Sequence, residues 1–373
     1  MYTSALLFLF FLIFSQVSVS TFAYYALPSN GSLRFMAITN ADNDQDQLAA
    51  VAQINPTTGS LSLHGNFSFA VTVVGVDCTT SFDPVRNVYY AITGNGPNID
   101  TIDAVSGKIL STVETEVAYG ITAVGYDPTT KSLKGIGGPV SGRTLQYIDI
   151  NATSGVIKVL NDDLKLTWPI PCESALSVAS QRYYTLSQTK QDDDADEVLL
   201  TIDVEKGTVI SSIPWAGANK KLGIINSIIV IPSQSLSSNE TIISWVIDHN
   251  FNHPPTLIWI DPISGLHKNL TSLPNKGTFK DSTVPLQASA LLYIDPTTGN
   301  ITIGSIIFDN AEDETYLAMV TIQPTGITMI NDEKIYSTFT ESDPVVTLDL
   351  VKVDAIGTQL LWAPAWVTPP ADM

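Results

Sequence analysis

The chain has 373 residues, of which 15% are charged, and its 37 acidic residues against 18 basic ones give a net charge of −19. An acidic excess of this size leaves no basic patch to neutralise phosphates, so we expect no nucleic-acid partner and no binding to an anionic membrane surface. The low charge content and the 44% of apolar residues are typical of short strands that are buried on both faces.

The first residues carry the pattern of a secretory signal. An unbroken apolar run at Leu6–Ile13 is followed by two small-x-small sequences, Ser18–Ser20 and Thr21–Ala23, which signal peptidase recognises. The run is shorter than the ~20 residues that span a bilayer, so we expect cleavage and no membrane insertion. We therefore predict a signal peptide over residues 1–23, one mature domain over residues 24–373, and secretion.

A tight turn of the form D-x-x-[ST]-G, flanked by two strand-like segments, recurs along the chain. It is found at Ile54–Gly59, Ile102–Gly107, Ile148–Gly155, Ile202–Gly207 and Ile260–Gly265, and in a degraded form at Ile322–Gly326. In such a turn the Asp or Asn side chain caps its own backbone, and the glycine supplies the positive φ needed to enter the next strand. A regular repeat of this kind predicts a repeat architecture.

A second turn, built on Asp-Pro, lies earlier in the same repeat. It occurs at Phe82–Asn87, Tyr126–Lys131 and Ile294–Gly299. One period then contains four antiparallel strands, A to D, in about 50 residues, which is the composition of a β-propeller blade. The sequence therefore predicts an all-β propeller; a pair of β-sandwiches, the competing fold, lacks a single regular period.

The repeat also sets the expected blades. They cover residues 24–69, 70–117, 118–168, 169–219, 220–280 and 281–333, with a weaker unit at 334–373. We prefer seven blades, with six as the alternative. In either case we expect the final unit to pair with an N-terminal strand, because closing the ring removes exposed sheet edges.

The segments from strand C to strand D resemble a known superfamily. Thr101–Leu110 and Leu257–Gly265 are similar to repeats of the quinoprotein-dehydrogenase-like and YVTN-type propellers. The resemblance implies architecture and no particular activity. The quinone-binding members carry a vicinal pair of cysteines and usually eight blades, and this chain has neither, so no quinone cofactor is expected.

Six N-x-[ST] triplets behind a signal peptide predict an N-glycosylated protein. They begin at Asn30, Asn66, Asn151, Asn239, Asn269 and Asn300. These asparagines map to turns and outer strands of the expected blades.

The two cysteines, Cys78 and Cys172, raise opposing arguments. An oxidising compartment favours a disulfide between them. Each lies 11 residues before a tyrosine pair, Tyr89-Tyr90 or Tyr183-Tyr184, so they occupy equivalent positions in blades that are two apart. A disulfide needs Cα atoms within ~7 Å, which this geometry opposes. We predict the bond on the strength of the compartment.

Acidic residues concentrate in loops between strands B and C. Asp42, Asp44 and Asp46 alternate as in a calcium loop, while Asp192–Glu197 and Asp309–Glu314 are dense acidic runs. Carboxylates at alternate positions supply three of the six to eight oxygens that Ca²⁺ requires. We predict weak calcium binding at the three aspartates; the competing interpretation is that all these loops are solvated acidic tips. Either way, B–C loops emerge on one face, which is predicted to be acidic.

No catalytic residues are predicted. His249 and His253 are close enough in sequence to share a metal, although a polar loop explains them equally, and no metalloprotease, nucleophile-elbow or phosphate-loop motif is present. The first hypothesis for function is a secreted, non-catalytic binding or extracellular-matrix module whose acidic B–C face contacts a protein or carbohydrate, with calcium the one cofactor suggested.

The alternative hypothesis is an extracellular propeller enzyme, a hydrolase or lyase, with its site at the central channel. The residues that line the channel distinguish the two. The expected inner strands Ala118–Gly125 and Gln287–Leu292 are small and apolar, which favours the binding module.

Overall fold

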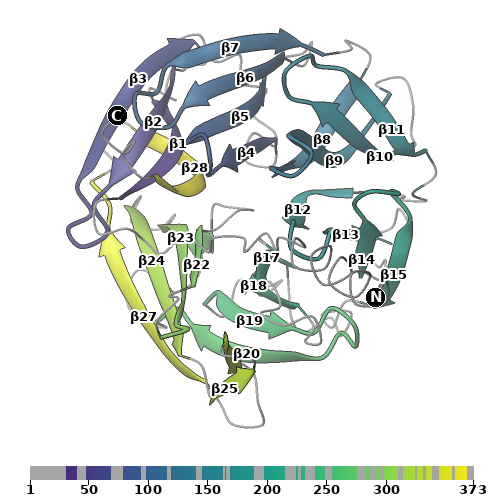
Figure 1. Cartoon of the computed structure of the whole chain (residues 1–373). Helices are drawn as coiled ribbons and strands as arrows, with labels where there is room; N and C mark the ends of the chain where they lie inside the picture. Colours follow the sequence, from purple (N-terminus) through teal and green to yellow (C-terminus); the bar gives the residue numbers. More distant parts are fainter. Residues whose placement is uncertain are drawn as a thin grey trace, which may run out of the picture.

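The protein is a ring of antiparallel sheets around a central axis (Figure 1). The computed structural model describes residues 31–39, 48–68, 79–93, 98–115, 119–139, 145–162, 164, 169–188, 197–214, 224–225, 228–231, 240–247, 254–274, 283–285, 291–294, 298–309, 314–323, 326–330, 333–337, 344–354 and 358–367.

The described strands form six blades, each with strands A to D running from the centre to the rim. Blade one comprises β28 (Thr358–Val367), β1 (Ser32–Thr39), β2 (Leu48–Ile54) and β3 (Leu61–Ser68). Blade two comprises β4 (Thr80–Asp83), β5 (Val88–Thr93), β6 (Asn98–Asp103) and β7 (Ile109–Glu114). Blade three comprises β8 (Tyr119–Asp127), β9 (Ser132–Pro139), β10 (Gln146–Asn151) and β11 (Ile157–Asn161).

The other three blades follow the same plan, with the innermost strand in two pieces in blades five and six. Blade four comprises β12 (Pro169–Ser177), β13 (Arg182–Gln188), β14 (Glu197–Asp203) and β15 (Val209–Pro214). Blade five comprises β16 (Ile224–Ile225) and β17 (Ile229–Ile231), then β18 (Thr241–Ile247), β19 (Thr256–Ile260) and β20 (His267–Ser272). Blade six comprises β21 (Thr283–Pro285) and β22 (Leu291–Ile294), then β23 (Ile301–Asp309), β24 (Glu314–Gln323) and β27 (Val345–Lys352).

The all-β propeller is confirmed, with six blades, the alternative count, in place of the preferred seven. Residues 334–373 do not form a blade of their own. They supply β27, the outer strand of blade six, and β28, the innermost strand of blade one. β28 pairs antiparallel with β1 from Ser32↔Val367 to Thr39↔Thr358, so the two ends of the described chain close the ring, as the weak final unit predicted.

The C–D turns of blades one to five share one geometry. In each, the glycine amide donates a hydrogen bond of 2.8 Å to the carbonyl of the Asp or Asn four residues earlier. Five glycines occupy this position with φ between 67° and 72°: Gly59, Gly107, Gly155, Gly207 and Gly265. The Asp or Asn side chain accepts further bonds from the turn, for example from the amides of Val105 and Ser106 to Asp103. The predicted turn chemistry is confirmed.

The same glycines also touch the neighbouring blade. A Cβ added to Gly155 would lie 2.1 Å from the carbonyl oxygen of Glu114, at the end of β7. At Gly59 and Gly107 it would lie 1.8 Å and 2.0 Å from the carbonyl oxygens of Lys352 and His64, also in outer strands. The outer strands β27, β3 and β7 therefore run along the rim to the C–D turn of the next blade (Figure 1), and the fit at these three turns leaves no room for a side chain.

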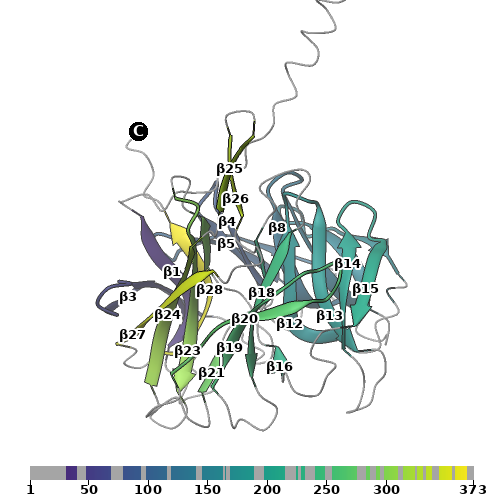
Figure 2. The ribbon, with the colours of Figure 1, turned by 90° about the horizontal axis from the view of Figure 1, so that it is seen from below.

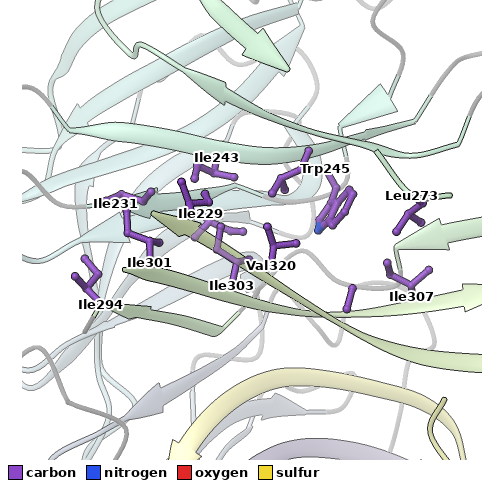
Figure 3. Packing of buried hydrophobic residues seen from close by; sticks show 13 residues of the cluster. Ile229, Ile231, Ile243, Trp245, Leu273, Ile294, Ile301, Ile303, Ile307 and Val320 are labelled. Carbon is purple, nitrogen blue, oxygen red and sulfur yellow. The ribbon is translucent and has the colours of Figure 1, made fainter. Parts of the chain in front are cut away.

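The hydrophobic core is divided among the gaps between blades. Six clusters of buried side chains fill the six gaps; the one between blades five and six contains Trp245, Ile303 and Val320 (Figure 3). The indole nitrogen of Trp245 donates across this gap to Ser305, at 3.1 Å. B and C strands are buried on both faces, as in β5, which is the arrangement that the composition predicted.

Blade six carries an insertion where the other blades have a C–D turn. β25 (Gly326–Ile330) and β26 (Glu333–Ser337) form a hairpin that pairs with no other strand in the described part of the chain. It projects away from the disc (Figure 2). Gly326, predicted to complete the sixth turn, instead begins β25.

The turn glycines generate a stability prediction. We expect Gly155→Ala to lower the free energy of unfolding by about 2–4 kcal/mol, since it combines a left-handed backbone with a clash against Glu114. Lys131→Gly is the matched control, because Lys131 also has positive φ (55°) in the same blade, and glycine relieves that strain. Denaturant unfolding measures both. Equal stability of Gly155→Ala and wild type would contradict the proposed fit.

The hairpin generates a second prediction. In blade two, the residues Asp103 and Lys108 close a four-residue loop, and Gln323↔Val345 is the corresponding pair of blade six. Replacing residues 324–344 by Ala-Val-Ser-Gly, together with Gln323→Asp, should leave the ring folded with an unchanged Tm, because the hairpin adds no strand to a blade. Calorimetry checks this, and a Tm loss as large as that of Gly155→Ala would show that the hairpin supports the ring.

Candidate interaction surfaces

The strand order gives the disc two unlike ends. In the described strands, the ends joined by A–B and C–D turns lie at one end of each blade, here called the turn face, and the ends that flank B–C connections lie at the other, here called the loop face. The hairpin β25–β26 replaces a C–D turn and so belongs to the turn face (Figure 2).

Most predicted ligand-binding residues lie outside the described residues. This holds for Asp42, Asp44 and Asp46, for residues 192–196 and for residues 310–313. The calcium site therefore stays a prediction, as does a metal at His249 and His253, which lie outside as well. Within the described residues, no group of three or more His, Cys, Asp or Glu side chains is placed to hold a metal ion.

One acidic residue at the edge of the loop face is described in detail. Glu314 begins β24, opposite Asp309, and accepts hydrogen bonds from Lys352 Nζ and the Tyr316 hydroxyl. The hydrogen bond from Lys352 has the largest effect, followed by that from Tyr316, and together they lower the pKa of Glu314. Its negative charge is therefore partly compensated by β27 of the same blade.

The disulfide also stays a prediction. Cys172 lies in β12, the innermost strand of blade four, as its alignment indicated. Cys78 lies outside the described residues, immediately before β4 of blade two. The position expected for Cys172, in the innermost strand of blade four, is therefore the one observed.

Four of the six predicted glycosylation sites fall on described residues. Asn66 is in β3 and Asn269 is exposed in β20, both outer strands; Asn151 is exposed in a C–D turn and Asn300 lies beside the A–B turn of blade six. Asn30 and Asn239 lie outside the described residues, as does the predicted signal peptide, and glycosylation stays a prediction. Among the segments the structure describes, no helix is long and apolar enough to cross a membrane.

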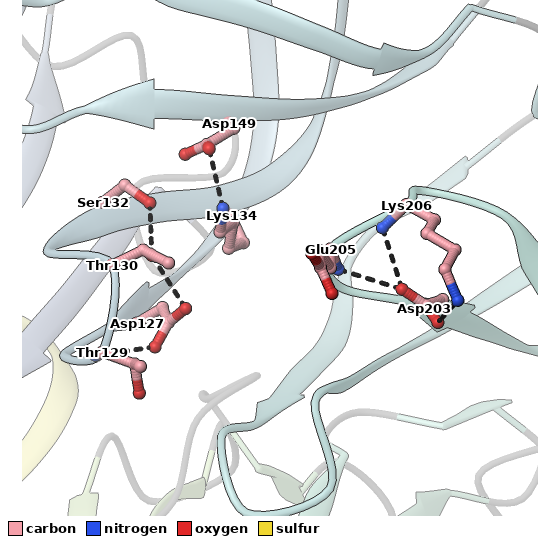
Figure 4. Close-up of polar contacts among 9 residues, drawn as sticks. All are labelled: Asp127, Thr129, Thr130, Ser132, Lys134, Asp149, Asp203, Glu205 and Lys206. Carbon is pink, nitrogen blue, oxygen red and sulfur yellow. Dashed lines mark hydrogen bonds and ion pairs between the residues drawn. The ribbon is translucent and has the colours of Figure 1, made fainter.

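The aspartates of the turn face act within the fold. Asp127 accepts bonds from the amide of Thr129 and the hydroxyl of Thr130, and buried Lys134 forms a 2.7 Å ion pair with Asp149 (Figure 4). Asp203 binds the amides of its own turn in the same way. Each carboxylate is thus occupied with backbone capping or a charge partner, as the turn chemistry predicted.

Tyrosines fill the gaps between blades near this face. Tyr90 stacks on Tyr126 with ring centroids 4.9 Å apart, and Tyr147 meets Tyr183 at 5.4 Å. Tyr184 donates to buried Glu240 of blade five, which also accepts a bond from the Ser177 hydroxyl. Burial is the first cause that raises the pKa values of Tyr89, Tyr126, Tyr147, Tyr183 and Tyr184.

The innermost strands are poor in charge. Among β4, β8, β12, β16, β17, β21, β22 and β28, the charged residues are Asp83, Asp127 and Glu173. Asp83 and Asp127 are buried and cap A–B turns, for example through the amide of Val85. The described innermost strands therefore consist mainly of small and apolar residues.

A feature of the rim was not found from the sequence. Large apolar side chains are exposed on the outer strands or C–D turns of consecutive blades: Ile109, Leu110, Val156, Val159, Val209, Ile210, Ile263 and Leu266. The signal was present, because two or more apolar residues follow each turn glycine, as in Gly107-Lys-Ile-Leu110. An edge strand cannot bury both of its faces, so one such residue must face solvent.

Comparison with known proteins supports the architecture. No protein-family model and no curated protein matches the sequence. The structure is similar to TolB from Acinetobacter baumannii, with 11% identity and a TM-score of 0.52 over 91% of this chain and 67% of that one.

Two further matches have TM-scores below 0.5. A chain of a nidogen–laminin complex matches with 13% identity and a TM-score of 0.44 over 85% of this chain and 98% of that one. An oligogalacturonate lyase from Vibrio parahaemolyticus matches with 10% identity and a TM-score of 0.39 over 87% of each chain. At such identities a likeness shows the fold alone, and the propeller architecture is the part of the resemblance that the structure confirms.

The buried tyrosines predict alkaline lability. Because their folded pKa values exceed the ~10 of an unfolded tyrosine, the native state holds protons that the unfolded state releases, and stability falls as the pH rises above ~10. Tyrosinate absorbance followed during a pH titration should show one group of tyrosines ionising normally and a second ionising only on unfolding. Ionisation of every tyrosine near pH ~10 in a folded protein would contradict this.

Proposed function

We propose that the protein is a secreted, N-glycosylated, non-catalytic binding module that presents its acidic B–C loops to a cationic segment of a protein partner. The observation that carries the proposal is the composition of the inner strands. Propeller enzymes place converging polar side chains at the channel, whereas the three charged residues found in the described inner strands include two buried turn caps, Asp83 and Asp127. The wall of the channel therefore offers few groups for acid–base or nucleophilic work.

The charge of the B–C connections supports the choice of surface. Residues 40–47, 94–97, 140–144, 189–196, 248–253 and 310–313 contain ten acidic residues and two basic ones. Because the described ends of strands B and C lie at the loop face, we expect these connections to emerge there together. A surface of one sign steers an oppositely charged partner and rejects a like-charged one.

The acidic charge of the B–C connections also distinguishes between a carbohydrate partner and a protein partner. An uncharged or acidic carbohydrate gains no charge–charge attraction from a carboxylate-rich surface, whereas Lys and Arg side chains combine that attraction with hydrogen bonds to the carboxylates. We therefore assign the loop face to a polypeptide with a basic segment. Calcium bound at Asp42, Asp44 and Asp46 would compete with such a partner for the same carboxylates.

The test uses an oligo-arginine peptide as the probe and the secreted protein at physiological ionic strength. Asp192→Asn, Asp193→Asn and Asp194→Asn together should weaken binding about tenfold, since three partial ion pairs of about 0.5 kcal/mol each are lost. The control triple variant, Asp162→Asn, Glu205→Gln and Asp354→Asn, removes the same charge from exposed positions outside the B–C connections. Fluorescence anisotropy measures both affinities.

Two results would contradict the proposal. Equal weakening by the two triple variants would show that net charge alone binds the peptide, with no role for the loop face. Turnover of an extracellular substrate that is abolished by a substitution in an innermost strand would establish the alternative, a channel enzyme.

A further inference from the structure

Exposed apolar side chains recur on the rim of three consecutive blades. They belong to the outer strands and C–D turns of blades two to four, and we call them the apolar rim: Ile109, Leu110, Val156, Val159, Val209 and Ile210. The exposed fraction of the residue exceeds one half at Leu110 (55%), Val156 (60%) and Ile210 (53%). Exposed apolar side chains on an edge strand invite association unless something covers them.

Asn151 lies directly beside the apolar rim. Asn151 ends β10 and faces Val156 across the C–D turn of blade three. Its backbone N–H donates a 3.0 Å hydrogen bond to the Val156 carbonyl. The Asn151 side-chain oxygen accepts bonds from the amides of Thr153 and Ser154, both at 2.9 Å. The turn thus uses the side-chain oxygen of Asn151, whereas a sugar would be attached to its side-chain nitrogen, Nδ2.

The other blades show that the turn has no need of an asparagine. Asp103, Asp203 and Asp261 occupy the same position and cap their turns through a carboxylate oxygen. Blade one has Asn55, but Pro56 follows it and blocks glycosylation. In blade three, Asn151 is followed by Ala152 and Thr153, which completes the acceptor triplet.

We propose that an N-linked glycan on Asn151 covers the apolar rim of blades two to four. This rests on the proposed secretion of the protein. The C–D turn of blade three is central to that rim: Gly155 abuts the end of β7 in blade two, and Asn161 of β11 donates a 2.7 Å bond to the Gly207 carbonyl of blade four. A hydrated, bulky sugar at this point shields apolar surface on both sides.

N-glycosylation of Asn151 needs one further reactant, the oligosaccharide donor. A bond forms between Asn151 Nδ2 and the anomeric carbon of a lipid-pyrophosphate-linked oligosaccharide. The bond from that carbon to the pyrophosphate oxygen breaks, and the amide loses one proton. The carbonyl oxygen is unchanged, so the hydrogen bonds from Thr153 and Ser154 persist.

The test compares secreted wild type with Asn151→Asp, which removes the glycan and retains the cap that Asp103 provides in blade two. We expect an unchanged Tm, a several-fold increase in the fluorescence of a bound apolar dye, and concentration-dependent self-association in ultracentrifugation. Adding Val156→Thr and Val159→Thr to Asn151→Asp should return both signals to the wild-type level. Asn300→Asp is the control, because it removes a predicted glycan at an A–B turn away from the apolar rim.

The outcomes separate this inference from the proposed function. Peptide mapping that finds Asn151 unmodified while other sequons carry sugar overturns the glycan cover and leaves secretion intact. A modified Asn151 whose loss changes neither dye binding nor self-association also overturns the cover. Retention of the chain inside the cell with every sequon unmodified overturns the proposed secretion, and the cover with it.

Discussion

The contact between a turn glycine and the outer strand of the preceding blade is the constraint on which the ring depends. It is made at Gly59, Gly107 and Gly155 against backbone carbonyls, and at Gly207 and Gly265 against the ends of β11 and β15. A residue with positive φ is needed to form the turn, and at Gly59, Gly107 and Gly155 a side chain would also clash with the neighbouring backbone. Because one position satisfies both needs, the local turn also sets the distance between successive blades, and this spacing brings β28 back to β1.

The division of the core follows from that spacing. Each buried cluster belongs to two blades, so no blade buries its own apolar surface, and stability comes from closing the ring. The sixth C–D turn is the exception, since the hairpin β25–β26 stands in its place. There the gap between blades five and six is filled by the large cluster around Trp245, whose indole bonds to Ser305. This packing explains how an insertion is tolerated at a position that glycine occupies elsewhere.

Turn chemistry is local, so the sequence predicted it well: the Asp or Asn caps and the five glycines were found from spacing alone, and ring closure followed from the incomplete last unit. The blade count was less determinate, because residues 334–373 contain two long strands that belong to different blades, and pairing between β28 and β1 is non-local. The apolar rim was not predicted from the sequence, because the exposure of Leu110 or Val156 depends on β7 and β11 being edge strands. The loop-face site residues, including Asp42 and Asp192, lie outside the described residues, so spacing remains their evidence.

The proposed function places the ligand on the loop face and not in the channel. Hydrogen–deuterium exchange of the protein, free and bound to the oligo-arginine peptide, distinguishes the two positions. We expect new protection at strand ends that flank B–C connections, such as Gln188 and Glu197 in blade four, with the buried B and C strands unchanged. Protection confined to the innermost strands β4, β8 and β28 would place the ligand in the channel and contradict the proposed function.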